Sequence, residues 1–489
     1  MTGILPIFPE ILLLALGVLI LVIDPFLKED DSRRSFLGWF TAGGLLVILL
    51  LSLLFARPAP GIDFFKTPIP VLVFGGMLRF DSLGFLFEMF FLFAAGVTAL
   101  FFMDTEPLNR RAEAYLLLVA ATLGMCLMAS SADLIMLYLA IETTSIPLYL
   151  LAGFLKGDDK STEAGFKYML FGALTSAVLL YGFTLIYGFT GQTGLYYLAI
   201  YFENFNLVAI GITFLVLAGL AFKVSLFPFH FWAPDVYEGA PTPVAGFLST
   251  ASKAAGFVVL IRLFTAVFLA VHVHPDWSLI LAVLATLTMT VGNLIALVQK
   301  NVKRLLAYSS IAHAGYAMIG VVAFSQLGVA SAIFYLIGYL LTNLLAFGIV
   351  GIVGRQTGSD DISAYSGLSR RNSTLGLAAL VAFLSLAGMP PFVGFVAKLF
   401  VFSSAIGAGW TWLAIVGVLN SIVGLYYYLN VLKYIYLYRM DGQDEDKHPI
   451  PVAFPVAIAL VVLSYGILLV GTLFGPWFSW AVSAARILF

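Results

Sequence analysis

Long apolar runs follow one another along this chain, and each is about the length of a helix that crosses a bilayer. Hydrophobic residues make up 61% of the sequence and charged residues only 10%, whereas soluble domains carry about 25% charged residues. A water-soluble globule could not bury so much apolar surface, so we predict an all-α polytopic membrane protein. With about 20 apolar residues per span, we expect about fourteen transmembrane helices, near residues 4–24, 36–56, 82–103, 113–131, 133–154, 163–190, 204–227, 239–270, 278–299, 304–324, 328–353, 373–404, 408–436 and 452–475.

Positive charge is concentrated in alternate connections between the predicted spans. Fifteen lysines and arginines lie in the odd-numbered connections and three in the even-numbered ones. Cytoplasmic loops carry the excess of basic residues, so we predict that odd connections face the cytoplasm and both termini the opposite side. The fifteen are Lys28, Arg33, Arg34, Arg110, Arg111, Lys156, Lys160, Lys300, Lys303, Arg304, Arg355, Arg370, Arg371, Arg439 and Lys447, and the three are Arg57, Lys66 and Arg79.

Composition also excludes several kinds of protein. A net charge of −1 offers no basic surface for nucleic acid. Cys126 is the only cysteine and the five histidines are scattered, so we expect neither a metal nor an iron–sulfur site. The apolar run Ile4–Ile23 has no basic region before it, so we interpret it as a retained first span and not as a cleaved signal peptide.

Proline interrupts two predicted spans, and each of these spans also holds a lysine. Span 7 breaks at Phe227-Pro228, close to Lys223, and span 12 breaks at Gly388–Pro391, close to Lys398. A broken helix frees backbone groups that protein or cavity water must satisfy. Because the breaks are five spans apart, we predict two inverted five-helix repeats, spans 4–8 and 9–13, as in secondary transporters.

This pattern divides the chain into four parts. They are three N-terminal spans (1–112), a first five-helix repeat (113–270), a second, inverted repeat (278–436), and a last span with its tail (437–489). The segment Pro58–Phe80 is too polar and proline-rich to span, and its Pro-Val-Leu-Val-Phe-Gly-Gly run predicts a short surface hairpin. We place the last residues, from Trp477, at the membrane interface.

Four charged residues inside the predicted spans are the main functional candidates. A lysine at bilayer depth costs about 3 kcal/mol on insertion scales, so it needs a partner, water or a function. Lys253 lies near mid-bilayer among small residues, and Lys398 lies beside the second break. Lys223 lies near the first break, where snorkelling to the surface is the alternative. Glu142 is mid-span, and is either a lysine's partner or a structural residue bonded to nearby threonines.

Other titratable residues are weaker candidates, because each also has a structural explanation. Lys167 suits a cytoplasmic belt of positive charge as well as a proton path. His230 follows the first break and could relay protons, because histidine titrates near neutrality. His313 is mid-span, where histidine is commonly a helix–helix contact. For Glu88 and Asp133 the alternatives are interfacial or packing roles, whereas Asp235 and Glu238, in a cytoplasmic turn, are interpreted as helix-capping residues.

Four stretches of this sequence resemble a known family. The first is FPFHFWAPDVYEGAPTPVAGFLSTASKAAG, residues 227–256, and the others are IETTSIPLYLLAG, KRLLAYSSIAHAGYAMIG and SLAGMPPFVGFVAK. They resemble the antiporter-like membrane subunits of respiratory complex I. The segment PDVYEGAPTPV is most similar to the N-type subunit of proton-translocating NADH:quinone oxidoreductase, a relative of mitochondrial subunit 2. The similarity covers nearly the whole chain.

The resemblance implies a fold and a set of site residues. The fold is fourteen helices with two inverted repeats and broken spans 7 and 12. Glu142 and Lys223 correspond to the family's coupled pair, Lys253 to its central lysine and Lys398 to the lysine of the exit half. Lys167, His230 and His313 are implied with less support. No cofactor or metal is expected in this chain, since NAD, FMN, iron–sulfur clusters and quinone belong to partner subunits.

The function expected from the resemblance is proton translocation coupled to quinone reduction elsewhere in the complex. The expected partners are the other membrane-arm subunits, including sister antiporter-like subunits, and lipids, with no nucleic acid. The expected location is the cell inner membrane, or the thylakoid membrane in a photosynthetic source. Two alternatives stay open: a subunit of a multisubunit sodium/proton antiporter, and a structural membrane subunit that pumps nothing.

Overall fold

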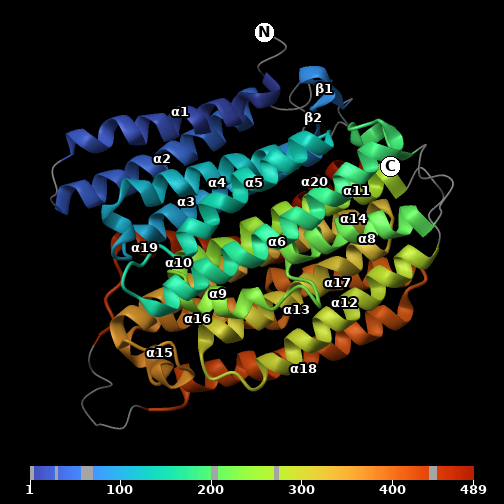
Figure 1. Ribbon diagram of the computed structural model, residues 1–489. Coiled ribbons are helices and arrows are strands. Elements are labelled where there is room, and N and C mark those ends of the chain that lie inside the picture. The colour runs from blue at the N-terminus through green and yellow to red at the C-terminus, as the bar shows by residue number, and fades with distance from the viewer. Residues whose placement is uncertain (1–4, 28–30, 57–69, 200–206, 269–274, 440–448) are drawn as a thin grey trace.

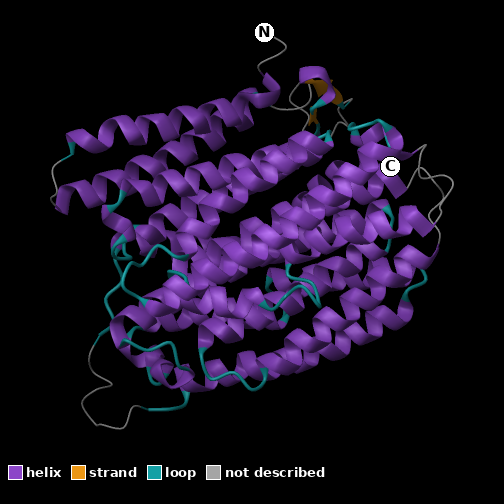
Figure 2. Cartoon of the chain, in the orientation of Figure 1, coloured by secondary structure: helices purple, strands orange, loops and turns teal. Residues whose placement is uncertain are grey.

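The computed structural model describes residues 5–27, 31–56, 70–199, 207–268, 275–439 and 449–489. Helices account for nearly all of the described chain and run side by side in one bundle (Figure 2). At one edge of the bundle lie α1 (Phe8–Ile23) and α2 (Asp31–Phe55), and at the opposite edge lies α18 (Thr411–Tyr436) (Figure 1). Twelve described helices are long and apolar enough to cross a membrane. The predicted all-helical, multi-pass membrane fold is therefore confirmed.

A short hairpin marks one end of the bundle. Strand β1 (Val71–Val73) pairs antiparallel with β2 (Leu78–Phe80), which confirms the predicted hairpin. The residues before it, 57–69, which include Arg57 and Lys66, lie outside the described residues. Helix α3 (Ser82–Phe102) follows β2 directly, and its N-cap Asp81 accepts a hydrogen bond of 2.8 Å from the Gly84 amide. The end of the bundle that carries β1 and β2 is called the hairpin end below.

The next helices contain the first predicted break. Polar caps delimit apolar runs here: Asp133 caps α5 and Asp158 caps α6, while Gly191, with a φ of 65°, ends α6. A π-helical turn, η6, interrupts the span between α10 and α11, which is buried over its whole length. These elements are α4 (Ala112–Ser130), α5 (Leu134–Ala152), α6 (Asp159–Thr190), α8 (Leu207–Val224), α9 (Trp232–Gly239), α10 (Thr242–Phe247), η6 (Leu248–Ser252) and α11 (Lys253–Phe268).

The remaining helices contain the second break and the C-terminal helices. The residues from Trp477, expected at the membrane interface, lie in α20, which packs against α14 and α3. The elements are α12 (Pro275–Ala296), α13 (Val302–Val322), α14 (Gln326–Thr357), α15 (Leu368–Arg371), α16 (Ser373–Ala387), α17 (Val393–Gly407), α18, α19 (Phe454–Thr472) and α20 (Phe474–Arg486).

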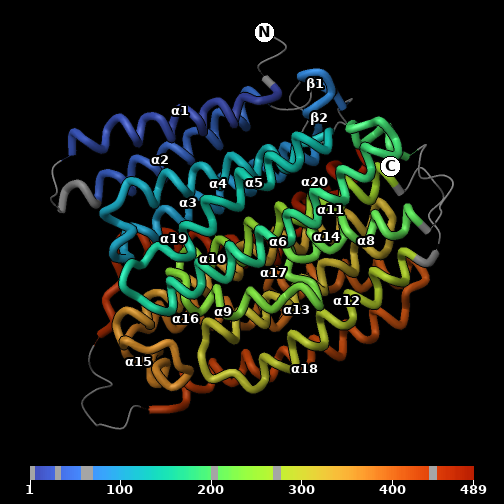
Figure 3. The backbone as a smooth tube through the Cα atoms, in the orientation of Figure 1, coloured from blue at the N-terminus to red at the C-terminus, as the bar shows by residue number. Residues whose placement is uncertain are grey.

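Both predicted helix breaks are present, and the chain can be followed through them in Figure 3. The helical path stops after Val224 and resumes in α9, and it stops after Ala387 and resumes in α17. Proline explains both interruptions, because it lacks the amide proton that would continue the helix. The expected spans 204–227 and 373–404 correspond to α8 and to α16 with α17. The exact number of crossings, the inverted relation of the two repeats and the four-part division stay predictions.

Candidate functional site

Three lysines are buried inside the helix bundle. The side chains of Lys223 on α8, Lys253 on α11 and Lys398 on α17 are exposed by no more than 6%. Each lies near an interruption of helix: Lys223 directly before the first break, Lys253 directly after η6, and Lys398 shortly after the second break. A π-helical turn inside an α-helix commonly marks a functional site. Helix interruptions therefore accompany all three of the lysines predicted from the sequence.

Lys223 is held by a hydroxyl group on a neighbouring helix. Its ammonium donates a hydrogen bond of 2.6 Å to the Ser145 Oγ on α5. A small cavity lies beside this contact, lined in part by Ser145, Tyr149, Thr175, Ser176 and Lys223. Its hydroxyl groups make the cavity suitable for ordered water, which needs polar partners.

Glu142 lies one helical turn before Ser145 on α5 and is half-buried. Its carboxylate interacts electrostatically with Lys223, but within the described chain no direct ion pair joins the two side chains. Its Oε1 is buried with no hydrogen-bond partner among the described residues. The structure therefore brings the predicted pair into electrostatic range and places Ser145 as the direct contact of the lysine.

Lys253 contacts the second half of the bundle. Its ammonium donates to the carbonyl oxygen of Ser310 at 3.1 Å and to the Ser310 Oγ at 2.7 Å. It also lies over the ring of Tyr237 on α9, 5.8 Å from the ring centre. Ser310 belongs to α13. The central lysine of the first predicted repeat is therefore bonded to a helix of the second.

His313 lies one turn after Ser310 on α13, at the centre of a chain of hydroxyl groups. Its Nδ1 is 2.6 Å from the Tyr335 hydroxyl oxygen on α14 and its Nε2 is 3.1 Å from the Tyr428 hydroxyl oxygen on α18. Tyr428 also shares a short hydrogen bond with the Ser309 hydroxyl. Lys253 and Lys398 both act electrostatically on His313, so the imidazole lies within electrostatic range of both lysines.

A second small cavity adjoins this imidazole. Its lining includes His313, Tyr335, Tyr339, Thr342 and Ser385. The Thr342 and Ser385 hydroxyl groups are 3.0 Å apart and hydrogen-bonded to each other. Leu386 on α16 and Ala397 on α17 also line the cavity, so it adjoins the second break.

Lys398 is bonded to the end of the broken helix. Its ammonium donates to the carbonyl oxygens of Leu386 at 3.1 Å and Ala387 at 3.0 Å, and to the Ser421 Oγ at 2.8 Å. Leu386 and Ala387 are the last residues of α16, whose final carbonyls have no partner within the helix. The negative end of a helix dipole stabilises a cation in this position.

His230 lies in the first break, as its sequence position predicts. It is buried, and its Nδ1 has no hydrogen-bond partner among the described residues. Lys253 acts on it electrostatically. The neighbouring amide of Phe227 donates to the Thr288 Oγ1 at 3.0 Å, which ties the break to α12. His230 therefore lies near the central lysine without being bonded to it.

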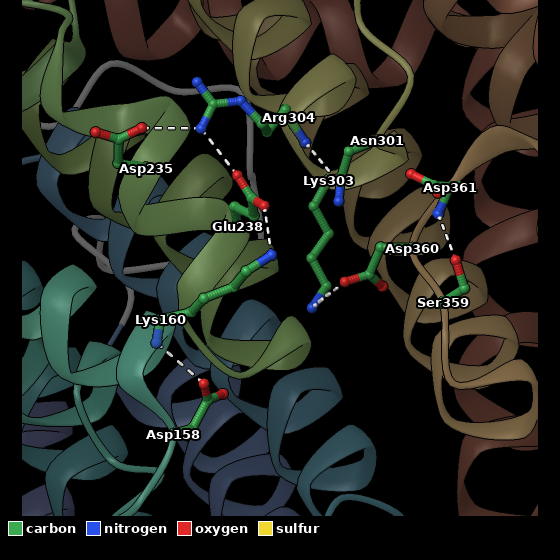
Figure 4. A network of polar contacts seen from close by, with 10 residues as sticks. All are labelled: Asp158, Lys160, Asp235, Glu238, Asn301, Lys303, Arg304, Ser359, Asp360 and Asp361. Atoms are coloured by element: carbon green, nitrogen blue, oxygen red, sulfur yellow. Dashed lines mark hydrogen bonds and ion pairs between the residues drawn. The ribbon is translucent and has the colours of Figure 1, made fainter.

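A group of ion pairs lies at the end of the bundle opposite the hairpin end, near the N-terminal ends of α6 and α13. We call it the ionic cluster, and Figure 4 shows part of it. Arg304 on α13 bonds to Asp235 and Glu238 on α9, each at 2.8 Å. Glu238 also pairs with Lys160 on α6 at 2.9 Å. Lys167 pairs with Asp235 at 2.6 Å and with its own-helix neighbour Glu163 at 2.6 Å. The cluster therefore connects α6, α9 and α13.

The prediction for Asp235 and Glu238 was wrong in structure and in role. They lie within helix α9 and not in a turn, and their carboxylates form ion pairs and not helix caps. Short-range sequence could not reveal this, because their partner Arg304 is more than sixty residues away. Glu88 is buried on α3, and Asp133 is the N-cap of α5, accepting from the amides of Ile135 and Met136.

The carboxylates of the ionic cluster stay charged in spite of partial burial. Helix α9 belongs to none of the candidate spans. Burial opposes the ionisation of Glu238, but hydrogen bonds from Arg304 and Lys160 outweigh it and hold the pKa of Glu238 below its usual value. Burial likewise opposes ionisation of Asp235, and bonds from Lys167 and Arg304 again hold the pKa of that carboxyl down.

The described residues contain no group of three or more His, Cys, Asp or Glu side chains that could hold a metal ion. The chemistry available is instead that of ammonium, imidazole, carboxyl and hydroxyl groups, all of which bind and release protons or orient water. The hydroxyl partners were not predicted from the sequence; they are Ser145, Ser310, Tyr335, Tyr428 and Ser421. A signal was present for two of them, because Ser145 and Ser310 each lie three residues from a candidate on the same helix face.

Residues 131–424 match the family described as NADH:quinone oxidoreductase/Mrp antiporter, TM. The chain is 41% identical over 482 residues to NADH-quinone oxidoreductase subunit N of Heliobacterium modesticaldum, with 98% of each chain covered.

Solved structures show the same fold. A chain of respiratory complex I from Thermus thermophilus superimposes with a TM-score of 0.78 and 34% identity, over 96% of this chain and 98% of that one. A chain of the Mrp complex from Dietzia sp. superimposes with a TM-score of 0.84 over 99% and 97% of the two chains. The identity to the Dietzia chain is 22%, so that similarity concerns the fold alone.

Proposed function

Because this chain belongs to the family of NADH:quinone oxidoreductase and Mrp antiporter membrane subunits, we propose that it is a proton-translocating subunit, of the N type, in a complex I-type NADH:quinone oxidoreductase. Quinone reduction takes place elsewhere in that complex. This chain receives the released energy as a conformational or electrostatic change and uses it to move protons. The whole-chain similarity to a relative that carries the subunit N name supports this assignment.

The observation that carries the proposal is the arrangement of buried lysines along one polar route. Lys253 is bonded to Ser310, His313 lies one turn further along the same helix, and His313 is in electrostatic contact with both Lys253 and Lys398. A cavity lined by hydroxyl groups continues from His313 to the second break. Since buried ammonium groups are expensive in a membrane, a purely structural subunit would gain nothing from this arrangement.

Lys223 is the first proton-binding residue of the proposed route. A nearby carboxylate stabilises an ammonium group, so movement of Glu142 away from Lys223 would release the proton of the lysine. The stem of Lys223 packs against α11 at Gly256, where a Cβ atom would lie 3.2 Å from the Lys223 Cγ. Gly256 is one turn from Lys253, so the two lysine side chains start close together on packed helices.

Lys253 is the second proton-binding residue, and from it the proton passes into the other half of the bundle. From Lys253 the route follows Ser310 and then His313, whose two ring nitrogens contact Tyr335 and Tyr428. An imidazole can accept a proton on one nitrogen and release one from the other. Lys398 then receives the proton, and Ser421 offers it a hydroxyl group on α18.

The remaining parts of the proposal concern the surroundings of the chain. We propose that it holds no redox cofactor or metal, and that it assembles with the other membrane-arm subunits, including sister antiporter-like subunits. We propose the cell inner membrane as its location, with both termini on the non-cytoplasmic side, because basic residues are concentrated in the odd connections. The ionic cluster then lies at the cytoplasmic end.

Lys253→Met in the assembled complex tests the function. Methionine keeps the length and apolar packing but cannot hold a proton, so we expect NADH oxidation and proton pumping both to fall at least about tenfold, as when an acid–base group is removed. Lys253→Arg should also fail, because arginine stays protonated. Pumping is measured in proteoliposomes with a pH-sensitive dye, and assembly by co-purification of the soluble subunits.

Lys433→Met is the matched control, because Lys433 is an exposed lysine on α18. It should assemble and pump at the parental rate. A Lys253→Met complex that pumps at the parental rate and ratio would remove Lys253 from the route. Assembly with iron–sulfur and flavin subunits separates this proposal from the sodium/proton antiporter alternative, which has no redox partner.

A further inference from the structure

A second group of buried charges lies at the hairpin end of the bundle, away from the polar route. The guanidinium of Arg262 on α11 binds both oxygens of Asp81, at 2.6 and 2.7 Å. Arg79 on β2 forms a second ion pair with Asp81 at 2.9 Å. Arg262 also donates to the Ala129 carbonyl and to the Tyr196 hydroxyl. Two arginines therefore surround one carboxylate that is completely buried.

Two further carboxyl groups are buried next to this ion-pair group. Glu10 on α1 is 6% exposed and Glu88 on α3 is 2% exposed. Both oxygens of Glu10 and the Oε2 of Glu88 are buried with no hydrogen-bond partner among the described residues. Glu10, Asp81 and Arg262 all act electrostatically on Glu88, and Glu10 and Glu88 both act on the buried thiol of Cys126.

The positions of Glu10, Glu88 and Cys126 on their helices explain why the three side chains interact. Glu10 lies in the first turn of α1, Glu88 in the second turn of α3, and Cys126 one turn before the end of α4. All three helix ends are at the hairpin end, and α1 and α3 both pack against α4. The two carboxyl groups therefore converge on one face of α4, at similar depth.

The charges of the described group balance only if one proton is present. Arg79 and Arg262 contribute two positive charges, whereas Asp81, Glu10 and Glu88 would contribute three negative charges if all were ionised. An unpaired buried charge is strongly unfavourable, and two adjacent carboxylates disfavour each other's ionisation. Asp81 is held ionised by both arginines, so the missing positive charge belongs with Glu10 and Glu88.

We propose that Glu10 and Glu88 form a proton-binding site in which the two carboxyl groups share one proton at neutral pH. This site is separate from the polar route and goes beyond the proposed function. It is connected to that route through one helix, because Glu88 interacts with Arg262 and α11 carries both Arg262 and Lys253. A proton suits the site because it needs no shell of several ligands, unlike a metal cation.

Infrared spectroscopy of the intact purified complex in liposomes tests this proposal. A protonated carboxyl group shows a carbonyl stretching band that shifts in D₂O and that an ionised carboxylate lacks. The wild-type complex should show the band at neutral pH, and subtraction of each variant spectrum removes bands from other subunits. Glu10→Gln and Glu88→Gln should each lose the full area of one carboxylic acid, because the remaining carboxylate then balances the arginines without a proton.

Glu113→Gln is the matched control, since Glu113 is exposed in the first turn of α4, and it should keep the band. Loss of the band in only one of the two buried variants would assign the proton to a single residue and overturn the shared site. Retention of the band in both would overturn it as well.

Two measurements on the unmutated complex keep the proposal testable even if a variant does not assemble. Absence from the wild-type spectrum of a D₂O-sensitive band from a buried acid would overturn the proposal. Disappearance of that band when sodium replaces choline at constant ionic strength would show that the site binds sodium, which also overturns the proton assignment. Retention of the band in sodium supports the proposal.

Discussion

The two broken segments of the bundle hold their lysines by different groups. At the second break, the ammonium of Lys398 binds the carbonyl oxygens of Leu386 and Ala387, which the break itself leaves free. At the first break, the ammonium of Lys223 binds the Ser145 hydroxyl on α5. Among the described residues, Glu142 acts electrostatically on Lys223, whereas no carboxylate is paired with Lys398.

At the first break, groups other than the lysine bind the carbonyl oxygens near the end of α8. The Leu226 amide donates to the Ala221 carbonyl at 2.8 Å, and the Trp232 indole donates to the Phe222 carbonyl at 3.1 Å. One sequence pattern, a lysine near a proline break, therefore produces two different environments. Lys398 binds two backbone carbonyl oxygens and one hydroxyl group, while Lys223 binds one hydroxyl group near the Glu142 carboxylate.

Replacement of Glu142 should have the largest effect, because it removes the nearby carboxylate that distinguishes the surroundings of Lys223 from those of Lys398. Glu142→Gln should lower pumping about a hundredfold, a typical loss for a residue in proton transfer, in a complex that still assembles. Dye-based pumping in proteoliposomes measures it. The matched control is the exposed Glu113→Gln, and pumping per electron unchanged in Glu142→Gln would make Glu142 a structural residue.

The serines test the comparison directly. Ser145→Ala removes the described hydrogen-bond partner of the Lys223 ammonium, whereas Ser421→Ala removes one of three from Lys398. A hydrogen bond to a charged group contributes about 1.5–3 kcal/mol. We expect a loss of pumping of about tenfold for Ser145→Ala and of less than about threefold for Ser421→Ala. Equal losses of pumping in the two variants would contradict the difference between the Lys223 and Lys398 sites.

Gly388 tests how firmly the surroundings of Lys398 are held in place. Gly388 ends α16 with a φ of 84°, and a Cβ atom there would lie 2.9 Å from the Lys398 Cδ. Gly388→Ala should lower stability by about 1–2 kcal/mol because alanine disfavours left-handed backbone, and should also displace Lys398 and reduce pumping. Thermal unfolding and pumping assays measure the two effects.

Gly191→Ala is the control for that substitution. Gly191 ends α6 with a φ of 65° and has open space around its Cα. It should lose similar stability with no change in pumping. If Gly388→Ala also pumps normally in the assembled complex, the close contact between Gly388 and Lys398 has no bearing on transport.

The smallest expected effect is a loss of stability in acid at the ionic cluster, which connects the helices of the first break to α13. The folded-state pKa values of Asp235 and Glu238 are below their usual values. Their contribution is therefore complete above the usual values of 3.8 and 4.5, and is lost as the pH falls through the folded values. Arg304→Gln should reduce this acid-dependent part of the thermal stability, while the exposed Arg111→Gln should not. Identical pH profiles for the two variants would refute the role of Arg304.

The sequence alone determined the membrane class, the places where helices break and the lysines near those breaks. These features follow from local physical chemistry. Apolar length sets the spans, Pro228 and Pro391 cannot continue a helix, and a lysine in an apolar run is conspicuous because burial of charge is expensive. The hairpin at Val71–Phe80 was predictable for the same reason, from short-range turn chemistry.

The contacts of each charged group depend on the tertiary structure. Ser145 is 78 positions from Lys223, and Ser310 is 57 positions from Lys253, so no local pattern could pair them. In a membrane bundle, lipid-facing and core-facing sides of a helix are both apolar, which removes the periodicity that shows helix orientation in soluble proteins. The rotation of each helix, the π-helical turn before Lys253 and the meeting of Glu10 with Glu88 therefore depend on side-chain packing between helices far apart in the chain.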